Sequence, residues 1–235
     1  MTTPFFTIIM ACTLSDYKGA ATDRERKLVR AIESVIAQTF GDWELLIVAD
    51  GCERTFDLVR EKYVGEKRID CFLMPQQNNE GVWKRVNDCR NYGHRVAKGK
   101  YCLYLDSDDC FGTEHLHKVY VGIGDQCIHK FYKPATENEF NCDTSMPNVV
   151  FFDDFIVFNK SDLLPRTKRS CSLQRGKCGT SNIAFKTELK VTWEDQTYLH
   201  DWRFIQQLMK FKIKTIQPCE YIVCHIPNPK NPIDV

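Results

Sequence analysis

Short apolar runs alternate with amphipathic stretches along roughly the first 125 residues of the chain. The apolar runs lack polar alternation, which is typical of strands buried on both faces of a sheet. The stretches between them repeat their apolar residues with helical periodicity. The pattern predicts strands at Phe5–Met10, Trp43–Asp50, Ile69–Leu73 and Tyr101–Leu105, and helices at Thr22–Ile36, Phe56–Tyr63, Val82–Ala97 and from Thr113 onward. Alternating strands and helices predict an α/β fold of βαβ units around a mostly parallel sheet.

Polar residues and glycines at the ends of two of these helices fit this interpretation. Thr22 and Glu25 have the spacing of a capping box, which predicts a helix beginning there. Gly99 follows the Val82–Ala97 helix at the position where glycine commonly ends a helix. Gly93 lies inside that helix, and close packing of the helix on the sheet would explain it.

The second half of the chain has a less regular pattern. Residues 126–147 are mixed and polar, and we expect a loop or a ragged hairpin there. Residues 160–180 are basic and contain glycine, and we expect a mobile loop. The apolar pattern predicts strands at Val149–Asn159, Ile213–Gln217 and Tyr221–His225, and a short amphipathic helix at Trp202–Phe211.

The strand Tyr101–Leu105 runs directly into an acidic cluster formed by Asp106, Asp108 and Asp109. Carboxylates so close together repel one another, and a bound Mg²⁺ or Mn²⁺ ion would offset that repulsion. A solvated turn with helix-capping aspartates would explain the same residues. This segment alone does not distinguish the two interpretations.

In an open α/β sheet, ligands bind at the carboxyl ends of the strands, which points to Thr13, Asp50 and the acidic cluster. Asp50 precedes a glycine, so it is either a turn residue or a carboxylate that binds a base or ribose. Arg90 either faces solvent or reaches the acidic cluster or a diphosphate. Asp201 begins the last predicted helix, either as a first-turn residue favoured by the helix dipole or as a general base.

Composition places few further limits on the chain. It has 235 residues, 43% hydrophobic and 27% charged, and its 32 basic and 31 acidic residues give a net charge of +1. These values fit one large soluble domain, or one domain plus a small appendage, and give no support for binding nucleic acid. The twelve cysteines include no C-x-x-C pair, and no secretory signal or transmembrane run is seen. We therefore expect reduced thiols in a cytoplasmic protein that makes at most peripheral contact with a membrane.

Several motifs, in this order along the chain, resemble those of family 2 glycosyltransferases, which have the GT-A fold. The opening strand, the Gln38-Thr39-Phe40 helix end and the Asp50-Gly51 turn resemble the first part of the family pattern. Arg90-Asn91-Tyr92-Gly93, followed by Leu105-Asp106-Ser107-Asp108-Asp109, resembles the family's helix and D-x-D element. His200-Asp201-Trp202 falls where the family has its Glu-Asp base motif. The resemblance covers most of the chain, from Phe5 to about His225.

The chain departs from the family pattern at three residues and in one loop. Ala49 replaces the first aspartate of the second-strand motif, and Cys52 replaces its serine. His200 replaces the glutamate that precedes the base, and the first loop, Leu14 to Ala21, is longer than usual. These departures affect the parts of the pattern that concern the donor and the base.

The resemblance implies one GT-A domain over residues 1–235, with a Rossmann-like, mostly parallel central sheet flanked by helices. Residues 1–125 would form the nucleotide-sugar-binding half, and residues 126–235 a smaller mixed half that binds the acceptor. The implied activity is metal-dependent, inverting transfer of a sugar from a nucleoside-diphosphate sugar. We expect this donor to be a UDP-sugar. The acceptor would be a hydroxyl of a glycan or a lipid-linked saccharide, as in polysaccharide biosynthesis.

The resemblance also implies a role for each candidate residue. Asp201 would be the catalytic base. The donor would be bound by Thr13, Asp50, Arg90, Asn91, Asp106, Ser107 and Asp108. Mn²⁺ or Mg²⁺ would be held by Asp106 and Asp108, with His225 as a further ligand, and Asp109 would either bind the metal or contact the ribose. The basic loop at residues 160–180 would close over the diphosphate.

Two other classes of protein would account for part of this pattern. A metal-dependent sugar nucleotidyltransferase can share the sheet and the acidic site, but it usually has a glycine- and arginine-rich loop after the first strand. No such loop follows Cys12. A non-catalytic nucleotide-sugar binding module would not need carboxylates at all three positions, Asp50, Asp106 to Asp109 and Asp201.

Overall fold

The computed structural model describes residues 3–17, 23–76, 81–124, 149–152, 180–194, 197, 199–211, 213–216 and 221–222. Its helices are α1 (Arg24–Ile36), α2 (Glu53–Lys62), α3 (Val82–Val96), α4 (His115–Gly124) and α5 (His200–Leu208), with a 3₁₀ turn η1 (Thr180–Asn182). Its strands are β1 (Phe6–Cys12), β2 (Trp43–Ala49), β3 (Ile69–Leu73), β4 (Tyr101–Tyr104), β5 (Cys110–Phe111), β6 (Val149–Phe152), β7 (Ile183–Lys186), β8 (Ile213–Ile216) and β9 (Tyr221–Ile222).

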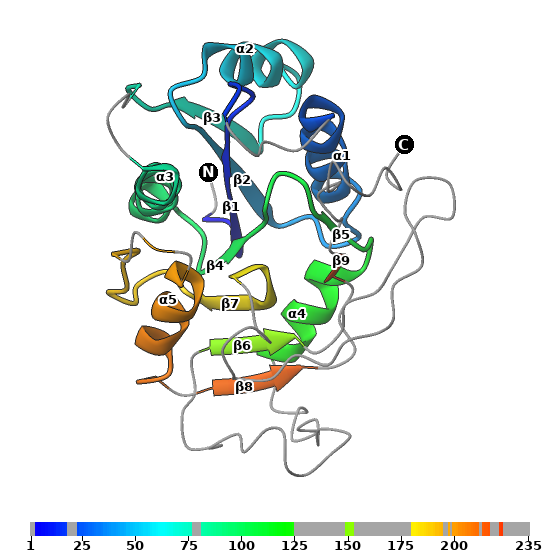
Figure 1. Ribbon diagram of the computed structural model, residues 1–235. Coiled ribbons are helices and arrows are strands. Elements are labelled where there is room, and N and C mark those ends of the chain that lie inside the picture. Colours follow the sequence, from blue (N-terminus) through cyan, green and yellow to red (C-terminus); the bar gives the residue numbers. More distant parts are fainter. Residues whose placement is uncertain are drawn as a thin grey trace.

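Seven strands form one sheet in the order β3-β2-β1-β4-β7-β6-β8, which runs from top to bottom in Figure 1. The first four strands in this order, β3, β2, β1 and β4, are parallel to one another. β7 is antiparallel to both β4 and β6, and β8 is parallel to β6. β5 and β9 form a separate antiparallel pair. The sheet is therefore mostly parallel, which confirms the predicted fold class.

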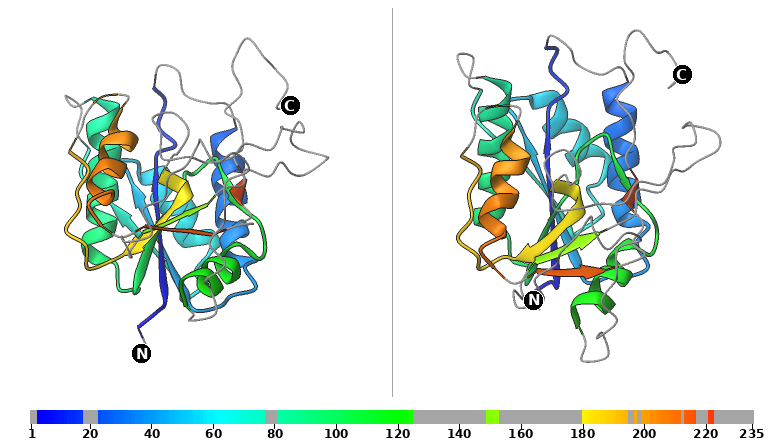
Figure 2. Two further views of the ribbon diagram at one scale, coloured as in Figure 1. Left: turned by 90° about the horizontal axis from the view of Figure 1, so that it is seen from below. Right: turned by 60° about the horizontal axis from the view of Figure 1, so that its bottom comes forward.

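Helices cover both faces of the sheet. One apolar cluster joins α1, α2 and α4 to the face that carries Ile8 and Met10 of β1. A second cluster joins α5 to the opposite face, which carries Ile9 and Phe185. In both views of Figure 2, α3 and α5 lie side by side, away from α1 and α4. Burial on both faces explains why β1 and β2 appear in the sequence as continuous apolar runs.

Close approach to β1 accounts for two glycines. A Cβ atom on Gly93 would lie 2.5 Å from Cγ2 of Ile9, so α3 packs on the sheet as closely as the sequence suggested. A Cβ atom on Gly99 would lie 2.5 Å from the backbone nitrogen of Thr7. Gly99 is not the helix cap that was predicted, because α3 ends earlier, with Ala97 as its C-cap. Its lack of a side chain lets the chain pass close to β1.

Two strands were missed by the sequence analysis. β7 has four residues and β5 has two, so neither presents a long enough apolar run to be recognised. β7 is central to the fold, because it pairs with β4 and so joins the second half of the chain to the first.

The start of α1 also differs from the prediction. The residue before the helix is Asp23, which has a φ of 52° and forms no side-chain capping hydrogen bond. Thr22 of the predicted capping box lies outside the described residues. The remaining helices and strands begin and end close to their predicted bounds wherever the chain is described.

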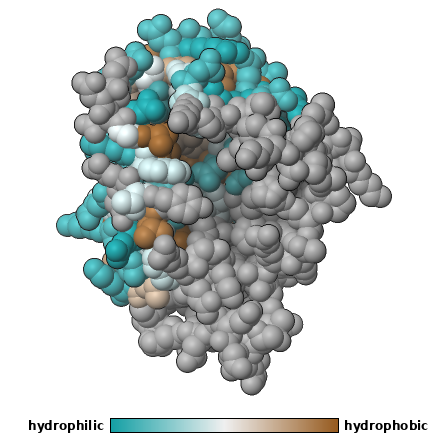
Figure 3. All heavy atoms as spheres, in the orientation of Figure 1, coloured by the Kyte–Doolittle hydropathy of each residue, from teal (hydrophilic) through white to brown (hydrophobic). Residues whose placement is uncertain are grey.

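Figure 3 shows hydrophilic side chains over α2, at the top of that view. Within the described ranges, no helix combines the length and the apolar character needed to cross a membrane.

Candidate active site

The acidic turn lies where β1 and β4 end, as the sequence predicted. The backbone N–H of Asp109 donates a hydrogen bond of 3.0 Å to the carbonyl oxygen of Asp106 and closes the turn. The Ser107 hydroxyl forms a hydrogen bond with the thiol of Cys12, the last residue of β1. The turn is thus fixed to the neighbouring strand at the carboxyl edge of the sheet.

Asp108 lies in the buried part of this turn. Burial, and then the neighbouring Asp106 carboxylate, raise the pKa of Asp108 to about 6. Lys27 and Arg30 on α1 oppose this effect, and Nη2 of Arg30 donates to the backbone oxygen of Asp108 at 3.2 Å. A buried carboxyl beside a second carboxylate is an arrangement that a bound cation would relieve.

The acidic turn does not form a complete metal site by itself. Across the part of the chain that the structure describes, no three His, Cys, Asp or Glu side chains gather to hold an ion. Asp109 is 5% exposed, and its role as a third carboxylate ligand stays a prediction. Asp106 and Asp108 remain as a pair. Such a pair fits Mg²⁺ or Mn²⁺, which often take one or two carboxylates and complete their shell with substrate phosphates and water.

Two of the predicted features fall on residues that are not described. His225, predicted as a further metal ligand, lies outside the described residues. The same is true of residues 160–179 of the predicted basic loop.

Arg90 joins the acidic turn to α5. Its Nη2 donates to Oδ1 of Asp106 at 2.9 Å, and its Nη1 lies 3.4 Å from Oδ1 of Asp201. The guanidinium is buried and lies 4.3 Å from the centroid of the Trp193 ring. Burial by itself lowers the pKa of Arg90, but the two carboxylates outweigh it and raise the pKa above its usual value. The structure therefore brings together three candidate residues that are far apart in the sequence.

Asp201 reaches the site because of its place on α5. The buried residues Phe204, Ile205 and Leu208 fix the face of α5 that packs on the sheet. Asp201 precedes them by three, four and seven positions, which puts it on the same face, at the N-terminal end. Its side chain is 39% exposed, so the carboxylate is accessible at the edge of the core. This position suits both predicted roles, a first-turn residue and a base.

Asn91 contacts Trp193 through both ends of its side-chain amide. Its Nδ2 donates to the backbone oxygen of Trp193 at 3.0 Å, and its Oδ1 accepts from the Trp193 backbone N–H at 2.8 Å. The Trp193 indole N–H donates to the Tyr104 hydroxyl at 3.0 Å. Because both ends of the amide bond the same residue, Asn91 holds Trp193 beside Arg90. A contact of Asn91 with a donor stays a prediction.

Asp50 lies at the end of β2, where its backbone N–H donates to the carbonyl of Cys12 at 2.8 Å. Its Oδ2 is 3.5 Å from Nη1 of Arg85. Burial raises the pKa of Asp50, and Arg85 opposes the rise. The next residue, Gly51, has a φ of +58°, and a Cβ atom there would lie 2.8 Å from Cα of Gln76. The turn after Asp50 therefore needs glycine both for its conformation and for space.

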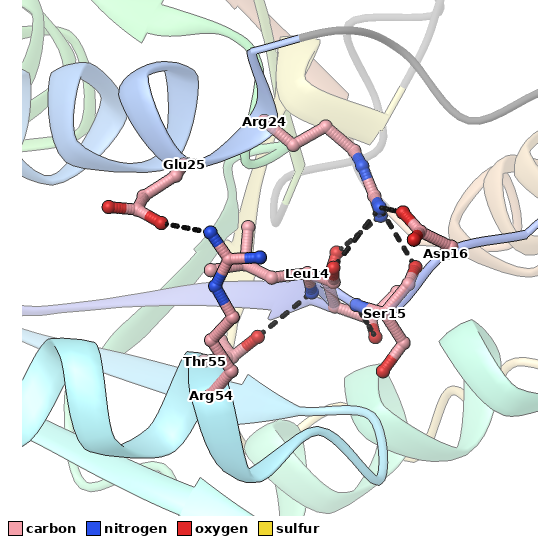
Figure 4. A network of polar contacts seen from close by, with 8 residues as sticks. Leu14, Ser15, Asp16, Arg24, Glu25, Arg54 and Thr55 are labelled. Carbon is pink, nitrogen blue, oxygen red and sulfur yellow. Dashed lines mark hydrogen bonds and ion pairs between the residues drawn. The ribbon is translucent and has the colours of Figure 1, made fainter.

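The loop after β1 is held in place by Arg24, as Figure 4 shows. Nη1 of Arg24 donates to the Thr13 carbonyl at 2.8 Å, and Nη2 of Arg24 donates to the Ser15 carbonyl at 2.9 Å. The Leu14 backbone N–H donates to Oγ1 of Thr55 at 2.9 Å. The Thr13 hydroxyl accepts from the Ser15 backbone N–H at 3.2 Å. Thr13 is thus placed at the sheet edge by the loop's own contacts, and its contact with a donor stays a prediction.

A cavity of about 640 Å³ lies beside this loop, at the carboxyl ends of β2 and β3. It is lined by Ser15 and by residues 51–54 and 73–76. Its volume is within the range of small-ligand sites. The lining includes Cys52 and Arg54, at the N-terminus of α2.

Several residues around the site were missed by the sequence analysis. Lys27 and Arg30 approach the acidic turn from α1, and Asn87 on α3 contacts His200, the neighbour of Asp201. One signal was available, because positions 83, 87, 90 and 91 share a helix face at helical spacing. That spacing predicts a common surface but not the element that the surface meets.

A mostly parallel sheet with helices on both faces is the GT-A fold of glycosyltransferases, and the acidic turn lies at the carboxyl edge of that sheet. The chain belongs to glycosyl transferase family 2, whose sequence model matches residues 20–139, about half of the chain. The predicted family is thereby confirmed.

Curated relatives match part of the chain. The bifunctional glycosyltransferase pgtA of Dictyostelium discoideum is 28% identical over 110 residues, which cover 45% of this chain and 14% of that protein. An uncharacterized glycosyltransferase of Haemophilus influenzae is 31% identical over 114 residues, covering 48% of this chain and 36% of that protein. The chain thus spans between about a seventh and a third of these relatives.

Solved structures match nearly all of the chain and show the same fold. Residues 1–349 of TarS from S. aureus align with a TM-score of 0.63 at 15% identity, over 93% of this chain and 60% of that one. The same TarS fragment with UDP-GlcNAc aligns with a TM-score of 0.60 at 14% identity, over 93% of this chain and 58% of that one. The mannosyltransferase PcManGT from Pyrobaculum calidifontis, with GDP-Man and Mn²⁺, aligns with a TM-score of 0.58 at 13% identity, over 97% of this chain and 59% of that one.

Proposed function

We propose that this protein transfers a sugar from a nucleoside-diphosphate sugar, and specifically a UDP-sugar, to a hydroxyl of a glycan or lipid-linked saccharide. The transfer would be inverting and would use a divalent cation. The observation that carries the proposal is the pair of contacts made by Arg90, at 2.9 Å to Asp106 and 3.4 Å to Asp201. Through these contacts Asp106, a carboxylate on the donor side, and Asp201, the candidate base, share the guanidinium of Arg90 at the carboxyl edge of the sheet.

The donor side of the site is formed by the ends of β1, β2 and β4. Asp50 would accept a hydrogen bond from the uracil ring, and the cavity beside it would receive the nucleoside. Support for the ligand class comes from TarS, which has been crystallised with UDP and with UDP-GlcNAc. Thr13 and Ser107 lie at the same edge and would complete the contacts to the nucleotide.

Asp106 and Asp108 would hold the cation. When bound, Mn²⁺ or Mg²⁺ supplies positive charge that stabilises the leaving diphosphate as a Lewis acid. PcManGT supports a cation of this kind, since its structure contains GDP-Man and Mn²⁺. The protein's own positive groups near this turn are Arg90, Lys27 and Arg30, which oppose the charge of the carboxylates.

Asp201 would act as the base. It would take the proton of the acceptor hydroxyl while that oxygen forms a bond to the anomeric carbon. The bond from the anomeric carbon to the diphosphate oxygen breaks at the same time, and the diphosphate leaves with the electron pair. Attack from the side opposite the diphosphate inverts the anomeric carbon. The partly exposed position of Asp201 is compatible with an acceptor approaching from solvent.

A donor panel tests the proposal directly. UDP-Glc, UDP-Gal, UDP-GlcNAc, UDP-GalNAc and GDP-Man would be incubated with the protein, with and without Mn²⁺, and release of the nucleoside diphosphate measured. We expect release from at least one UDP-sugar that requires Mn²⁺. Release of pyrophosphate from UTP and a sugar 1-phosphate would instead identify nucleotidyl transfer and overturn the proposal.

The base assignment has its own test in the variant Asp201→Asn. We expect turnover to fall by roughly 10²- to 10⁴-fold, since the amide cannot accept the proton. The affinity for UDP and Mn²⁺, measured by calorimetry, should be unchanged. Asp57→Asn is a matched control, because Asp57 is an exposed residue of α2 away from the site. Full turnover by Asp201→Asn would refute the role of Asp201.

A further inference from the structure

His200 lies immediately before Asp201, at the first position of α5, and its side chain is buried. Burying a ring that can carry charge requires hydrogen-bond partners, and the contacts of this ring show what it is positioned to do. Its two nitrogens meet different parts of the site, Asn87 on α3 and Asp201 on α5.

The ring is fixed in place from α3 and from the segment before α5. Nδ1 of His200 lies 2.8 Å from Oδ1 of Asn87, a residue that is 2% exposed. The ring centroid lies 4.7 Å from that of Trp83 and 5.6 Å from that of Trp193. A hydrogen bond at one edge and two aromatic neighbours leave the imidazole little freedom to turn.

The other nitrogen faces the candidate base. Nε2 of His200 lies 3.4 Å from Oδ1 of Asp201, and Nη1 of Arg90 lies 3.4 Å from the same oxygen. Among the described residues, the charged groups in these contacts include Asp201 on α5 and Arg90 on α3, and Arg90 is in turn paired with Asp106. Because both of these contacts are to Oδ1, they restrain the orientation of the Asp201 carboxylate.

We propose that His200 is a positioning residue for the base, which acts by donating from Nε2 to Oδ1 of Asp201 while Asn87 holds Nδ1. The proposal rests on the proposed function, since it assigns a task to the residue beside the proposed base. His200 stands where the family pattern has glutamate. A second carboxylate there would repel Asp201, whereas an imidazole N–H can bond it.

The contact between His200 and Asn87 determines how the proposed donation from Nε2 to Asp201 depends on pH. When Nδ1 donates its hydrogen to the Asn87 oxygen, Nε2 carries a hydrogen only in the protonated ring. Loss of that proton at high pH removes the donor that faces Asp201. We therefore expect support of the base to be present in the imidazolium form and to be lost as the ring deprotonates.

Three variants test the role through the rate of Mn²⁺-dependent UDP release from the most active UDP-sugar. His200→Phe keeps a ring between the two tryptophans but has no donor, and we expect kcat to fall about 10- to 100-fold with unchanged KM for the donor. His200→Gln can place an amide N–H near the Nε2 position, and should recover most of the rate. In the wild type the rate should decline at high pH as the ring deprotonates, and this decline should be missing in His200→Gln.

His94→Gln is the matched control, because His94 is a largely buried histidine on α3 that bonds the Thr187 carbonyl at 2.9 Å, outside the site. We expect it to change thermal stability but not kcat. If His200→Phe turned over like the wild type, or His200→Gln showed the same decline at high pH, the proposal would be overturned. Full activity of Asp201→Asn would instead show that Asp201 is not the base, and would count against the proposed function.

A measurement without any donor tests the contact itself. The imidazole ¹⁵N signals of labelled protein would be followed by NMR against pH, with His200 identified from the His200→Gln spectrum. The Asp201 carboxylate stabilises the imidazolium, so Asp201→Asn should lower the titration midpoint of His200 and leave that of His94 in place. An unchanged midpoint for His200 would show that Nε2 does not bond Asp201.

Discussion

Arg90 is the residue through which the two sides of the site are connected. Its planar guanidinium can donate to two carboxylates in different directions, which a lysine ammonium on a flexible stem does less well. Its contacts with Asp106 and Asp201 give the buried guanidinium and both carboxylates a partner of opposite charge. The sequence offered solvent, the acidic cluster or a diphosphate as alternatives for Arg90. In the structure Arg90 contacts Asp106 of the cluster, and a contact with a diphosphate stays a prediction.

We expect Arg90→Lys to lower the free energy of unfolding by about 1–3 kcal/mol, since one charge-assisted hydrogen bond is lost in a buried setting. Urea unfolding followed by circular dichroism measures the change. Arg95→Lys is the control, because Arg95 is exposed on the same helix and lies 5.1 Å from the Tyr92 ring. A loss of stability in the control equal to that of Arg90→Lys would show that the bridging contacts are not the cause.

Cys52 lies at the edge of the cavity, and we expect the reactivity of its thiol to depend on pH. Burial by itself raises the pKa of this thiol, but hydrogen bonds from Ser15 and Thr55 outweigh it and lower the pKa to about 7. Burial raises the pKa of Cys71 to about 12. The thiolate is the reactive form, so alkylation of Cys52 by iodoacetamide should increase with a midpoint near pH 7 and level off above it.

Mass spectrometry of the labelled peptides measures this difference. Cys71 should react slowly from pH 6 to 9, and Cys52→Ser should remove the fast-reacting site. Equal rates for Cys52 and Cys71 across this range would contradict the lowered pKa of Cys52.

At the scale of elements, α3 contributes more to the site than any single strand end. Arg90 and Asn87 lie on the face of α3 that meets α5, and Gly93 lies where the helix contacts β1. The close approach at Gly93 sets the distance of α3 from the sheet. The distance of Arg90 from Asp106 depends on that packing, so the glycine and the arginine of the Arg90-Asn91-Tyr92-Gly93 motif act together.

We expect Gly93→Ala to destabilise the protein by about 1–2 kcal/mol, because overpacking against buried Ile9 exceeds the gain of about 1 kcal/mol in helix propensity. Gly65→Ala is the control, since a Cβ atom there would meet nothing within 4 Å. The control should be neutral or slightly stabilising in the same urea unfolding experiment. Greater stability of Gly93→Ala than of the wild type would show that the packing is looser than the structure has it.

A buried polar cluster ties the first elements together and was not predicted. Glu44 on β2 accepts from the Thr7 hydroxyl at 2.6 Å and from the Lys98 backbone N–H at 2.6 Å. The Gly99 backbone N–H donates to Oγ1 of Thr7 at 2.8 Å. These bonds join β1, β2 and the segment before β4, and they satisfy polar groups that would otherwise be buried without partners.

At the scale of the whole molecule, the sheet takes strands from both halves of the sequence. β4 from the first half is hydrogen-bonded to β7 from the second. We propose on this basis that residues 1–235 form one domain, with a donor-binding half and an acceptor-binding half. Within one sheet, neither half can separate without exposing a strand edge.

We therefore expect unfolding in urea to give the same midpoint by far-UV circular dichroism and by tryptophan fluorescence, as coincident transitions indicate cooperative unfolding. The fluorescence reports on both halves, since Trp43 lies on β2 and Trp193 packs beside α5. Two separate midpoints would contradict the single domain.

The sequence predicted much of the fold because its strongest signals are local. The buried runs at β1, β2 and β4 and the helical periodicity of α1 and α3 follow from burial on a sheet, and these elements lie close to their predicted positions. β7 was missed because four residues carry too little periodicity, although the strand is central. The cap expected at Gly99 was wrong because the reason for that glycine is the approach of β1, which is not a local property.

The same division applies to the site. The sequence by itself determined which residue types stand at the strand ends and at the start of α5, because strand polarity and helix starts depend on neighbours in the chain. Only the tertiary structure decided which of them meet, because the contacts of Arg90 with Asp201 and of His200 with Asn87 join residues more than a hundred positions apart. It also showed that Asn91 bonds to the backbone of Trp193. Such pairings depend on how α3 and α5 pack on one face of the sheet, and the pattern along the chain does not contain that information.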